Sequence, residues 1–458
     1  MLVPKIEKLI GIEVYATRSS GIGGVIRQNI EDFVVEELLA DGSKATIEAP
    51  AKSEALGASN IRNRYLLCVL VKRNWDTFAA IKAVADQLGI GLKQISIAGI
   101  KDAKAVTAQH VTIEETTLEE VEKVKIKDIA LYPVGYVRNK LSSFYLFGNS
   151  FHINISSINH TPSTIRKRIA QTVEELKQIG GIPNFFGHQR FGTTRPITHL
   201  VGKAILKENF KKAAMLFLAK PSPHEHSASR QARKELQATQ NFKQALQNFP
   251  KQLRYERIML KQLAEKPNDY IGAFKKLPVK LQELFIQAYQ SYLFNKFLSK
   301  RIANGLQLNK AEIGDYVVSL QRSGLPMVTM YKIANTQTLS EINKAISTGK
   351  MRLAIPLIGF KQPVSQGVQG ETEKHILEEE GNIKPEHFKI KTLPELTTRG
   401  ELRTTLTPLN NFTLNEISQD PTTQKNKAKT SFTLHRGSYA TTALREIMKT
   451  RNPIKAKF

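Results

Sequence analysis

Cysteine is almost absent from this chain of 458 residues, which contains only Cys68. A single cysteine excludes an intramolecular disulfide framework and any zinc site built on cysteine pairs. Cys68 lies inside the apolar run 65–71, a setting typical of a small buried core residue. A chain without a disulfide framework suits a reducing compartment, and we expect the protein in the cytoplasm.

Long hydrophobic segments are missing as well. No stretch approaches the roughly 20 apolar residues that cross a bilayer. The first residues include Glu7 and Glu13, and they lack the apolar region and cleavage site of a signal peptide. These absences predict a protein without a membrane-spanning helix or a secretory signal.

Several cofactor motifs are also lacking. The phosphate-binding and dinucleotide-binding glycine patterns do not occur, and neither does the Gly-x-Ser-x-Gly motif of serine hydrolases. His224 and His226 form a pair, but no cysteine or carboxylate cluster stands beside them to complete a metal site. We therefore expect no metal and no nucleotide cofactor.

Positive charge, in contrast, is abundant. The chain has 67 Lys and Arg against 41 Asp and Glu, a formal net charge of +26. Such an excess attracts polyanions over long range, and nucleic acid is the commonest soluble polyanion. A generally basic proteome would produce the same excess, so charge alone favours a nucleic-acid partner without establishing one.

Hydrophobic periodicity predicts strands and helices in an irregular order. Strands are expected in 22–37 (two, around a turn at 28–29), 65–72, 93–114, 143–155 (a pair, with a turn at Gly148-Asn149) and 431–434. Helices are expected after Asp76 or Thr77 up to Gly89, over 163–179, over 281–302, and after a turn at 436–437 through Met448. The polar stretches 369–382 and 415–429 are typical of surface loops.

This order favours an α+β fold with a mixed or antiparallel sheet over a doubly wound one, because strands and helices do not alternate strictly. After about residue 200 the sequence becomes polar and rich in predicted helices, and the last fifty residues return to strand and helix. A catalytic domain interrupted by an insertion explains this change. We predict a catalytic domain formed by residues 1–192 and 401–458, with an inserted domain over 193–400.

Asp102 stands in a turn that follows a predicted strand ending near Gly99. An aspartate at such a place most often caps the next turn or helix through its carboxylate. Alternatively it is a carboxylate nucleophile, which needs a fixed position and a nearby cation to stay ionised. Spacing alone does not decide between these two interpretations.

The segment 183–192, Pro-Asn-Phe-Phe-Gly-His-Gln-Arg-Phe-Gly, combines adjacent aromatic rings with amides and an arginine. One interpretation is a hydrophobic loop packed on the core. The other is a stacking surface beside hydrogen-bond donors, which a flipped-out base requires. Two further segments, 287–295 and 432–446, carry aromatic and basic residues that suit either a core or a site.

Six segments, in this order along the chain, resemble the TruD family of pseudouridine synthases. They are Glu31-Asp-Phe-Val-Val-Glu-Glu37, Gly99-Ile-Lys-Asp-Ala-Lys-Ala-Val-Thr107, Gly148-Asn149 with Phe151, Asn184-Phe-Phe-Gly-His-Gln-Arg-Phe-Gly192, Ser291-Tyr-Leu-Phe-Asn295, and Arg436-Gly-Ser-Tyr-Ala440 with Leu444-Arg-Glu446. They span nearly the whole chain, and six segments in register make the resemblance specific.

The resemblance implies an enzyme that converts uridine to pseudouridine in tRNA, usually at position 13, without metal or organic cofactor. It also implies the pseudouridine synthase fold, a mixed, largely antiparallel sheet flanked by helices, with an inserted α/β TRUD domain. Asp102 would be the nucleophile, acting on a base flipped out of the RNA. The family usually places a lysine six residues before Phe33; this chain has Arg27 there, which retains the charge and would pair with Asp102.

The same resemblance suggests roles for other residues. Phe33 and Phe186 would flank the base, Asn184 would hydrogen-bond near the sugar or Asp102, Glu37 would lie near the pocket, and Gln189 would touch the base or backbone. Lys101 and Arg190 would be structural or would contact RNA phosphates, and Arg436 would contact RNA. We expect a monomer that binds tRNA, with salt-sensitive affinity.

Three other function classes remain to be weighed. A non-catalytic RNA-binding protein of the same fold would be free to lose Asp102 and its neighbouring cation. An RNA methyltransferase would need a glycine-rich loop for its methyl donor, and none is present. A basic scaffold protein would explain the charge but not the ordered motifs.

Overall fold

A large mixed sheet forms one half of the computed structural model, which describes residues 2–49 and 55–458. Its strands follow the order β13-β14-β6-β1-β4-β2-β5, with β3 paired to β4. Their bounds are β1 Phe33–Leu39, β2 Tyr65–Arg73, β3 Ile95–Ile97, β4 Val106–Glu114, β5 Ile129–Val137, β6 Leu146–Ile158, β13 Asn410–Gln419 and β14 Asn426–His435. Only β1 and β4 pair in parallel within this order, so the predicted mixed, largely antiparallel sheet is confirmed.

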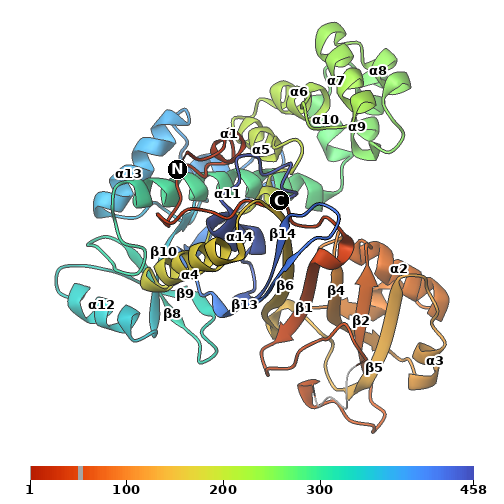
Figure 1. Ribbon diagram of the computed structural model, residues 1–458. Helices are drawn as coiled ribbons and strands as arrows, with labels where there is room; N and C mark the ends of the chain where they lie inside the picture. Colours follow the sequence, from red (N-terminus) through yellow and green to blue (C-terminus); the bar gives the residue numbers. More distant parts are fainter. Residues whose placement is uncertain (1, 50–54) are drawn as a thin grey trace.

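Segments far apart in the sequence meet in this sheet. Strand β14 pairs with β6, and Figure 1 shows the blue C-terminal strands beside the N-terminal ones. Helices α4 Pro162–Gln178 and α14 Ala440–Met448 pack on the face that carries Phe33 and Phe151. Helix α2 Thr77–Leu88 packs against the row formed by Leu66, Cys68 and Leu70 of β2. One continuous sheet therefore unites residues before 160 with residues after 409.

Helix α2 begins and ends where its capping residues predict. The Asp76 carboxylate accepts hydrogen bonds from the backbone N–H groups of Phe78 (3.0 Å) and Ala79 (3.1 Å), which caps the first turn. Gly89 ends the helix in the left-handed region at φ 68°. These caps define both ends of α2, after which the chain passes through β3 before it reaches the Asp102 loop.

A helical segment follows the first part of the sheet. Its helices are α5 Thr198–Leu206, α6 Phe210–Ala219, α7 Ser227–Thr239, α8 Phe242–Asn248, α9 Arg254–Glu265, α10 Tyr270–Lys275 and α11 Val279–Ala303. Figure 1 shows α6 to α10 as a group beside the body of the molecule, with α11 running through its middle. Both faces of α11 are buried, which explains the apolar residues all around it.

A second, four-stranded sheet lies beyond α11, with the order β11-β10-β8-β9. Its strands are β8 Tyr316–Leu320, β9 Pro326–Ile333, β10 Met351–Leu357 and β11 Glu401–Thr404, accompanied by α12 Leu339–Ser347 and α13 Gly367–Glu379. A short pair, β7 Ile182–Pro183 with β12 Leu406–Thr407, links the two halves of the chain. Because β11 belongs to the second sheet, we propose that the inserted domain ends after Thr404; its start at 193 stays a prediction.

Three local predictions were wrong. Residues 146–158 form one strand without a turn at Gly148. A Cβ atom at this position would lie only 2.1 Å from the carbonyl oxygen of Leu434, so the glycine allows β14 to approach closely. In 22–37, Val25 forms only an isolated bridge to Ser156 before β1. The stretches expected as loops contain α13 and parts of β13 and β14; in α13, the polar residues Gln369 and Glu373 are buried.

Candidate active site

Parallel pairing of β1 and β4 brings Arg27 and Asp102 together. Val34 of β1 lies opposite Val106 of β4, so the segments that precede the two strands leave the sheet at the same edge. Arg27 precedes β1 and Asp102 precedes β4. Residues 75 positions apart in the sequence thus become neighbours.

Arg27 holds the Asp102 carboxylate from one side. Its Nη2 donates to Oδ1 of Asp102 at 3.1 Å, and its guanidinium lies 3.9 Å from the centre of the Phe33 ring. The backbone of Arg27 is left-handed at φ 56°, a conformation that costs energy for any residue other than glycine. Burial lowers the pKa of Arg27, and the charge of Asp102 opposes that shift. A strained, half-buried arginine is thus fixed against one carboxylate oxygen.

The main chain of the Asp102 loop is held from behind by β2 and α2. Lys72 is fully buried, and its Nζ donates to the carbonyl oxygens of Asp102 (2.7 Å) and Trp75 (2.8 Å). The hydroxyl of Thr77 contacts the backbone N–H and carbonyl of Lys101 at 3.1 Å. No hydrogen bond to Oδ2 of Asp102 comes from the described residues. The loop is therefore rigidly anchored while one carboxylate oxygen stays free to react.

A cavity of about 450 Å³ opens beside Asp102. It lies on the face of the sheet that carries Phe33, Val35 and Phe151. Its lining is made of Arg27, Phe33, Val35, Ile100, Lys101, Asp102, Leu146, Asn149, Phe151, Gln189 and residues 436–441. The cavity is thus apolar below and polar at its rim, with the free carboxylate at its edge, an arrangement typical of a small-ligand site.

Asn149 is a residue to which the sequence assigned no role. It lines the cavity, and its Oδ1 is buried without a hydrogen-bond partner among the described residues. A buried acceptor without a partner costs about 1–3 kcal/mol, which a bound donor would recover. Its position in the Gly148-Asn149 motif was the available signal, but the expected turn obscured it.

Glu37 and Lys101 form a buried ion pair next to the cavity, which Lys101 helps to line. Lys101 Nζ donates to Oε1 of Glu37 at 2.5 Å, and the backbone N–H of His110 donates to Oε2 at 2.9 Å. The Glu37 side chain is 0% exposed and that of Lys101 is 3% exposed. An ammonium buried in this way cannot reach a phosphate at the surface, so the expected RNA contact of Lys101 does not fit the structure. We propose that both residues support the Asp102 loop.

Asn184 and Phe186 lie apart from Asp102. The Nδ2 of Asn184 donates to the backbone carbonyl and hydroxyl of Thr404 (3.1 and 3.2 Å), and its Oδ1 accepts from Arg403 at 2.6 Å. The ring of Phe186 is covered by the Arg403 guanidinium at 4.0 Å. Both residues line a neighbouring cavity and not the one beside Asp102. The structure thus places both residues beside the neighbouring cavity, and the contacts of Phe186 with the base and of Asn184 with the sugar stay predictions.

The remaining predicted residues lie around the two cavities. Gln189 lines the cavity beside Asp102 and accepts a hydrogen bond from Thr441 at 3.4 Å. Arg190 donates to Ser291 and Gln287, both at 3.2 Å, and lines the neighbouring cavity. Arg436 lines both cavities and donates to the carbonyl of Ser143 at 2.5 Å.

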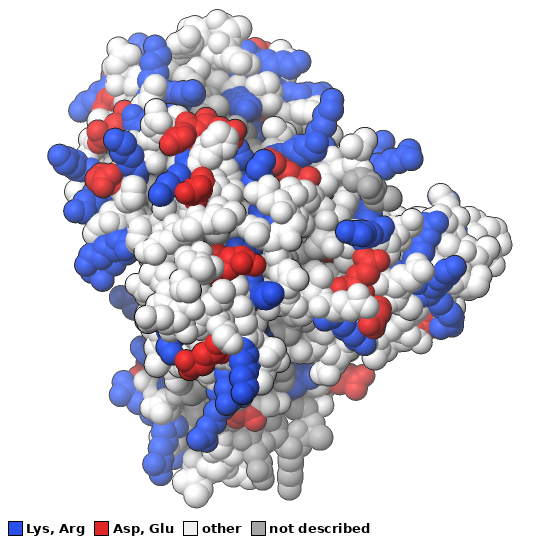
Figure 2. All heavy atoms as spheres, turned by 90° about the vertical axis from the view of Figure 1, so that its left-hand side faces the viewer, with Lys and Arg blue, Asp and Glu red and all other residues white. Residues whose placement is uncertain are grey.

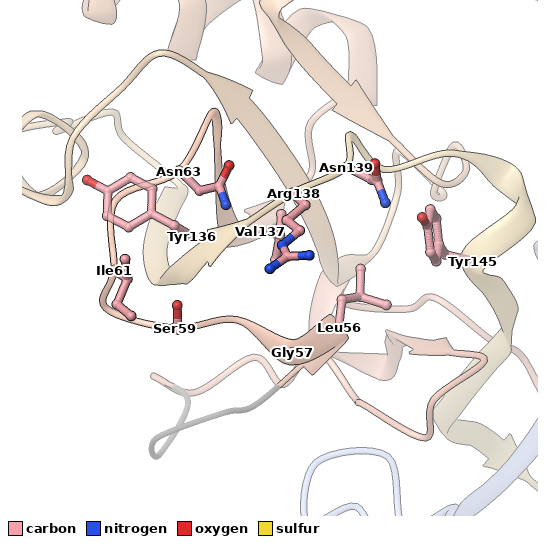
Figure 3. Close-up of a pocket in the computed structure, with 10 residues that line it drawn as sticks. All are labelled: Leu56, Gly57, Ser59, Ile61, Asn63, Tyr136, Val137, Arg138, Asn139 and Tyr145. Carbon is pink, nitrogen blue, oxygen red and sulfur yellow. The ribbon is translucent and has the colours of Figure 1, made fainter.

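A third cavity, of about 570 Å³, lies between residues 56–63 and the end of β5. Figure 3 shows Arg138 in its middle, with Tyr136 and Tyr145 on opposite sides. Its described lining includes no carboxylate and none of the residues singled out from the sequence. It lacks the nucleophile that the Asp102 cavity has.

Basic side chains are distributed widely over one face of the molecule (Figure 2). On the face shown in Figure 2, Lys and Arg side chains are spread over the whole surface, with acidic side chains between them. In the described ranges, no group of three or more His, Cys, Asp and Glu side chains is placed to hold a metal ion. None of the helices in those ranges is long and apolar enough to cross a bilayer.

The sequence and the fold both match known proteins. Residues 9–447 match the family model of tRNA pseudouridine synthase D (TruD). The chain belongs to the TruD family of tRNA pseudouridine synthases. Its resemblance to this family in six sequence segments is thereby confirmed.

Relatives within the family match nearly the whole chain. A protein of Methanosarcina acetivorans named tRNA pseudouridine synthase D is 39% identical over 98% of both chains. A protein of the same name from Pyrococcus furiosus is 36% identical, covering 95% of this chain and 98% of its own. The crystal structure of the Methanosarcina mazei TruD protein is 38% identical, with a TM-score of 0.83 over 99% of this chain and 100% of its own.

Proposed function

We propose that the protein isomerises uridine to pseudouridine in tRNA, with Asp102 as the nucleophile. The observation that carries the proposal is the Asp102 carboxylate at the edge of a cavity, with Oδ1 bound by Arg27 and Oδ2 free. Membership of the TruD family supports the reaction and the substrate class. Position 13 of the tRNA is the family's usual target, and we propose it here.

The reaction needs only groups that the site contains. The N1–C1′ bond of the uridine breaks, the uracil turns while it remains bound, and C5 joins C1′ as the C5 proton leaves and N1 gains one. No atom is gained or lost, so the reaction requires no oxidant and no second substrate. An ionised Asp102 adds to the sugar or to the base and leaves again, because a carboxylate is both nucleophile and leaving group.

Arg27 supplies the cation that pairs with this carboxylate. Its guanidinium lies at hydrogen-bond distance from Oδ1 and balances the negative charge of Asp102 in a half-buried setting. The stacking of Arg27 on Phe33 fixes the direction of its donors. Arg27 therefore fulfils the role of the lysine that the family usually has at this position.

The cavity walls suit a uracil ring. Phe33, Val35 and Phe151 form an apolar floor, and the unpartnered Oδ1 of Asn149 is an acceptor for the N3–H of uracil. We propose that the target uridine is flipped out of the RNA and bound here, since a paired base cannot reach Asp102. Arg436 and Gln189 at the rim would contact the neighbouring RNA backbone.

Incubation with an unmodified tRNA transcript tests the proposal. Pseudouridine is mapped by carbodiimide labelling and by mass spectrometry of nuclease fragments, and we expect one new pseudouridine, at position 13. Pseudouridine at another position would correct the target and leave the reaction in place. If tRNA is bound but no pseudouridine forms in any RNA offered, the non-catalytic RNA-binding alternative would replace the proposal.

A further inference from the structure

The cavity next to the Asp102 cavity lies between the end of β14 and the second sheet. It measures about 430 Å³ and shares Arg436, Gly437 and Ser438 with the Asp102 cavity. Its other lining residues are Asn184, Phe186, Arg190, Pro326, Val328, Arg352, Leu357, Leu402, Glu401, Arg403, Thr404, Thr407 and His435. Its volume is in the range of about 300–1,000 Å³ that bound small molecules occupy. We call it the arginine pocket.

Four arginines line the arginine pocket: Arg190, Arg352, Arg403 and Arg436. None of them forms an ion pair with a carboxylate in the part of the chain that the structure describes. Glu401 is the one acid among the lining residues, and burial raises its pKa despite the charges of Arg403 and Arg190. The pocket therefore carries a net positive charge that the protein does not neutralise.

Arg352 is the clearest sign of a missing partner. It belongs to β10 and is half-buried, and its guanidinium makes no hydrogen bond or ion pair with any described residue. Burial and, to a smaller extent, the nearby charge of Arg352 lower the pKa of the His435 imidazole to about 4. A half-buried guanidinium without an acceptor is unfavourable unless a ligand supplies one.

Arg403 is similarly uncompensated. Its donors go to neutral oxygens, namely the backbone carbonyl and Oδ1 of Asn184 (3.0 and 2.6 Å) and the carbonyl of Gly437 (2.9 Å). Burial lowers its pKa to about 10. These bonds fix the guanidinium against Phe186, so the charge is held in place before any ligand arrives.

One wall of the arginine pocket is apolar. Pro326 and Val328 of β9 and Leu357 of β10 contribute apolar lining. An inorganic anion would leave this wall unused. A phosphate joined to a sugar would use the arginines and the apolar wall together.

We propose that the arginine pocket binds a backbone phosphate, with its ribose, of a nucleotide next to the target uridine. This inference rests on the proposed function, because it takes the Asp102 cavity as the site of the target uridine. The two cavities share the turn at 436–438, so adjacent nucleotides of one strand would occupy them together. Arg352 and Arg403 from the inserted part then bind the same strand whose uridine meets Asp102.

Arg352→Gln tests the pocket, and Lys332→Gln is its matched control. Lys332 is exposed on β9 of the same sheet and does not line the pocket, so it removes the same charge without removing the contact. For an unmodified tRNA transcript we expect Arg352→Gln to raise the Kd about tenfold, the loss of one charged hydrogen-bond partner. The slope of log K against log salt should fall by about one. Lys332→Gln should change the Kd less than twofold.

A second experiment identifies the phosphate that the pocket binds. In tRNAs that carry one neutral methylphosphonate at successive positions along the whole chain, the wild-type protein should lose about tenfold in affinity at one phosphate. Arg352→Gln should be insensitive to that same replacement. Millimolar inorganic phosphate should not compete with the tRNA at constant ionic strength; competition would assign the pocket to free phosphate.

Equal effects of Arg352→Gln and Lys332→Gln, or equal sensitivity of both proteins to every methylphosphonate, would overturn the proposal. Thermal unfolding of both variants checks that they fold, and the methylphosphonate series on the wild-type protein needs no variant. All these readouts measure binding, so they hold even if no pseudouridine forms. Failure of the proposed function and failure of the arginine pocket are thus separate results.

Discussion

Lys72 donates a 2.7 Å hydrogen bond from its buried ammonium to the backbone carbonyl of Asp102. The lysine lies on β2, which pairs with β4 on one side and β5 on the other, so its backbone is held on both edges. No carboxylate forms an ion pair with it among the described residues. The position of the nucleophile is therefore set by a strand inside the sheet as well as by its own loop.

Replacing Lys72 should impair the reaction through Asp102. Burial lowers the pKa of Lys72 to about 8, while the nearby Asp102 charge opposes that shift. We expect Lys72→Met to lower kcat by about 10-fold to 100-fold with little change in KM, because misplacement of a reacting group affects the chemical step. In the wild type, kcat should also fall as the pH rises through about 8 and the ammonium loses its proton. Steady-state kinetics against pH measure both effects.

The control for this variant is Lys82→Met, which removes an exposed lysine from α2. It should leave kcat and the pH profile unchanged. A kcat–pH profile of Lys72→Met that keeps the step near 8 would contradict a role for Lys72 charge. An unchanged kcat would show that the loop holds Asp102 without it.

Arg27 should be replaceable by lysine but not by a neutral residue. Arg27→Lys keeps a cation near Asp102 but loses the planar stacking on Phe33, so we expect a loss of about tenfold or less in kcat. Arg27→Met leaves the Asp102 carboxylate without its cationic partner and its fixed orientation, and kcat should fall by about 100-fold or more. Single-turnover rates at saturating enzyme separate this effect from RNA binding. Equal rates in the two variants would mean that the charge of Arg27 is not needed.

The buried pair of Glu37 and Lys101 should govern stability. Glu37→Gln leaves the ammonium buried without a carboxylate, which costs about 3–5 kcal/mol. We expect thermal unfolding about 10 °C lower than in the wild type. The exposed pair of Glu31 and Arg73 provides the control, since Glu31→Gln should cost about 1 kcal/mol or less. Similar shifts in the two variants would contradict the importance of the buried pair.

Glu36 should make stability depend on pH in acid. Burial alone would raise the pKa of Glu36, but hydrogen bonds from His152 and Lys44 outweigh burial and lower the pKa to about 2. Because the folded-state pKa is depressed, the stabilisation is present above about pH 4.5 and is lost as the pH falls toward 2. Glu36→Gln should unfold at a temperature that varies less over this window than the wild type does. A parallel decline in both proteins would assign the acid sensitivity to other groups.

Elements with local signals were predictable from the sequence. The cap at Asp76 and the stop at Gly89 define α2 without help from the rest of the fold. The neighbourhood of Arg27 and Asp102 was also expected, because the resemblance aligned both motifs with one family. The catalytic roles of these two residues stay predictions.

Contacts between distant segments were not predictable. In the sequence, Lys72 is only a polar residue near the end of an apolar strand. Its role could not be predicted, because the carbonyl that accepts its hydrogen bond belongs to a loop 30 residues away. Asn184 was expected near Asp102, but its partner Thr404 comes from 220 residues later and turns its amide toward the second sheet. Glu37 was expected near the pocket, but its burial depends on the register of β1 with β4. Each of these outcomes depends on strand pairing that composition and periodicity do not encode.

The most direct test of the account compares Asp102→Asn with the wild type on the same tRNA. The substitution keeps the size of the side chain and removes the negative charge that makes it a nucleophile. We expect the variant to bind the transcript within about twofold of the wild-type Kd and to form no pseudouridine in a single turnover. Pseudouridine formation by Asp102→Asn at the wild-type rate would contradict the assignment of Asp102 as the nucleophile.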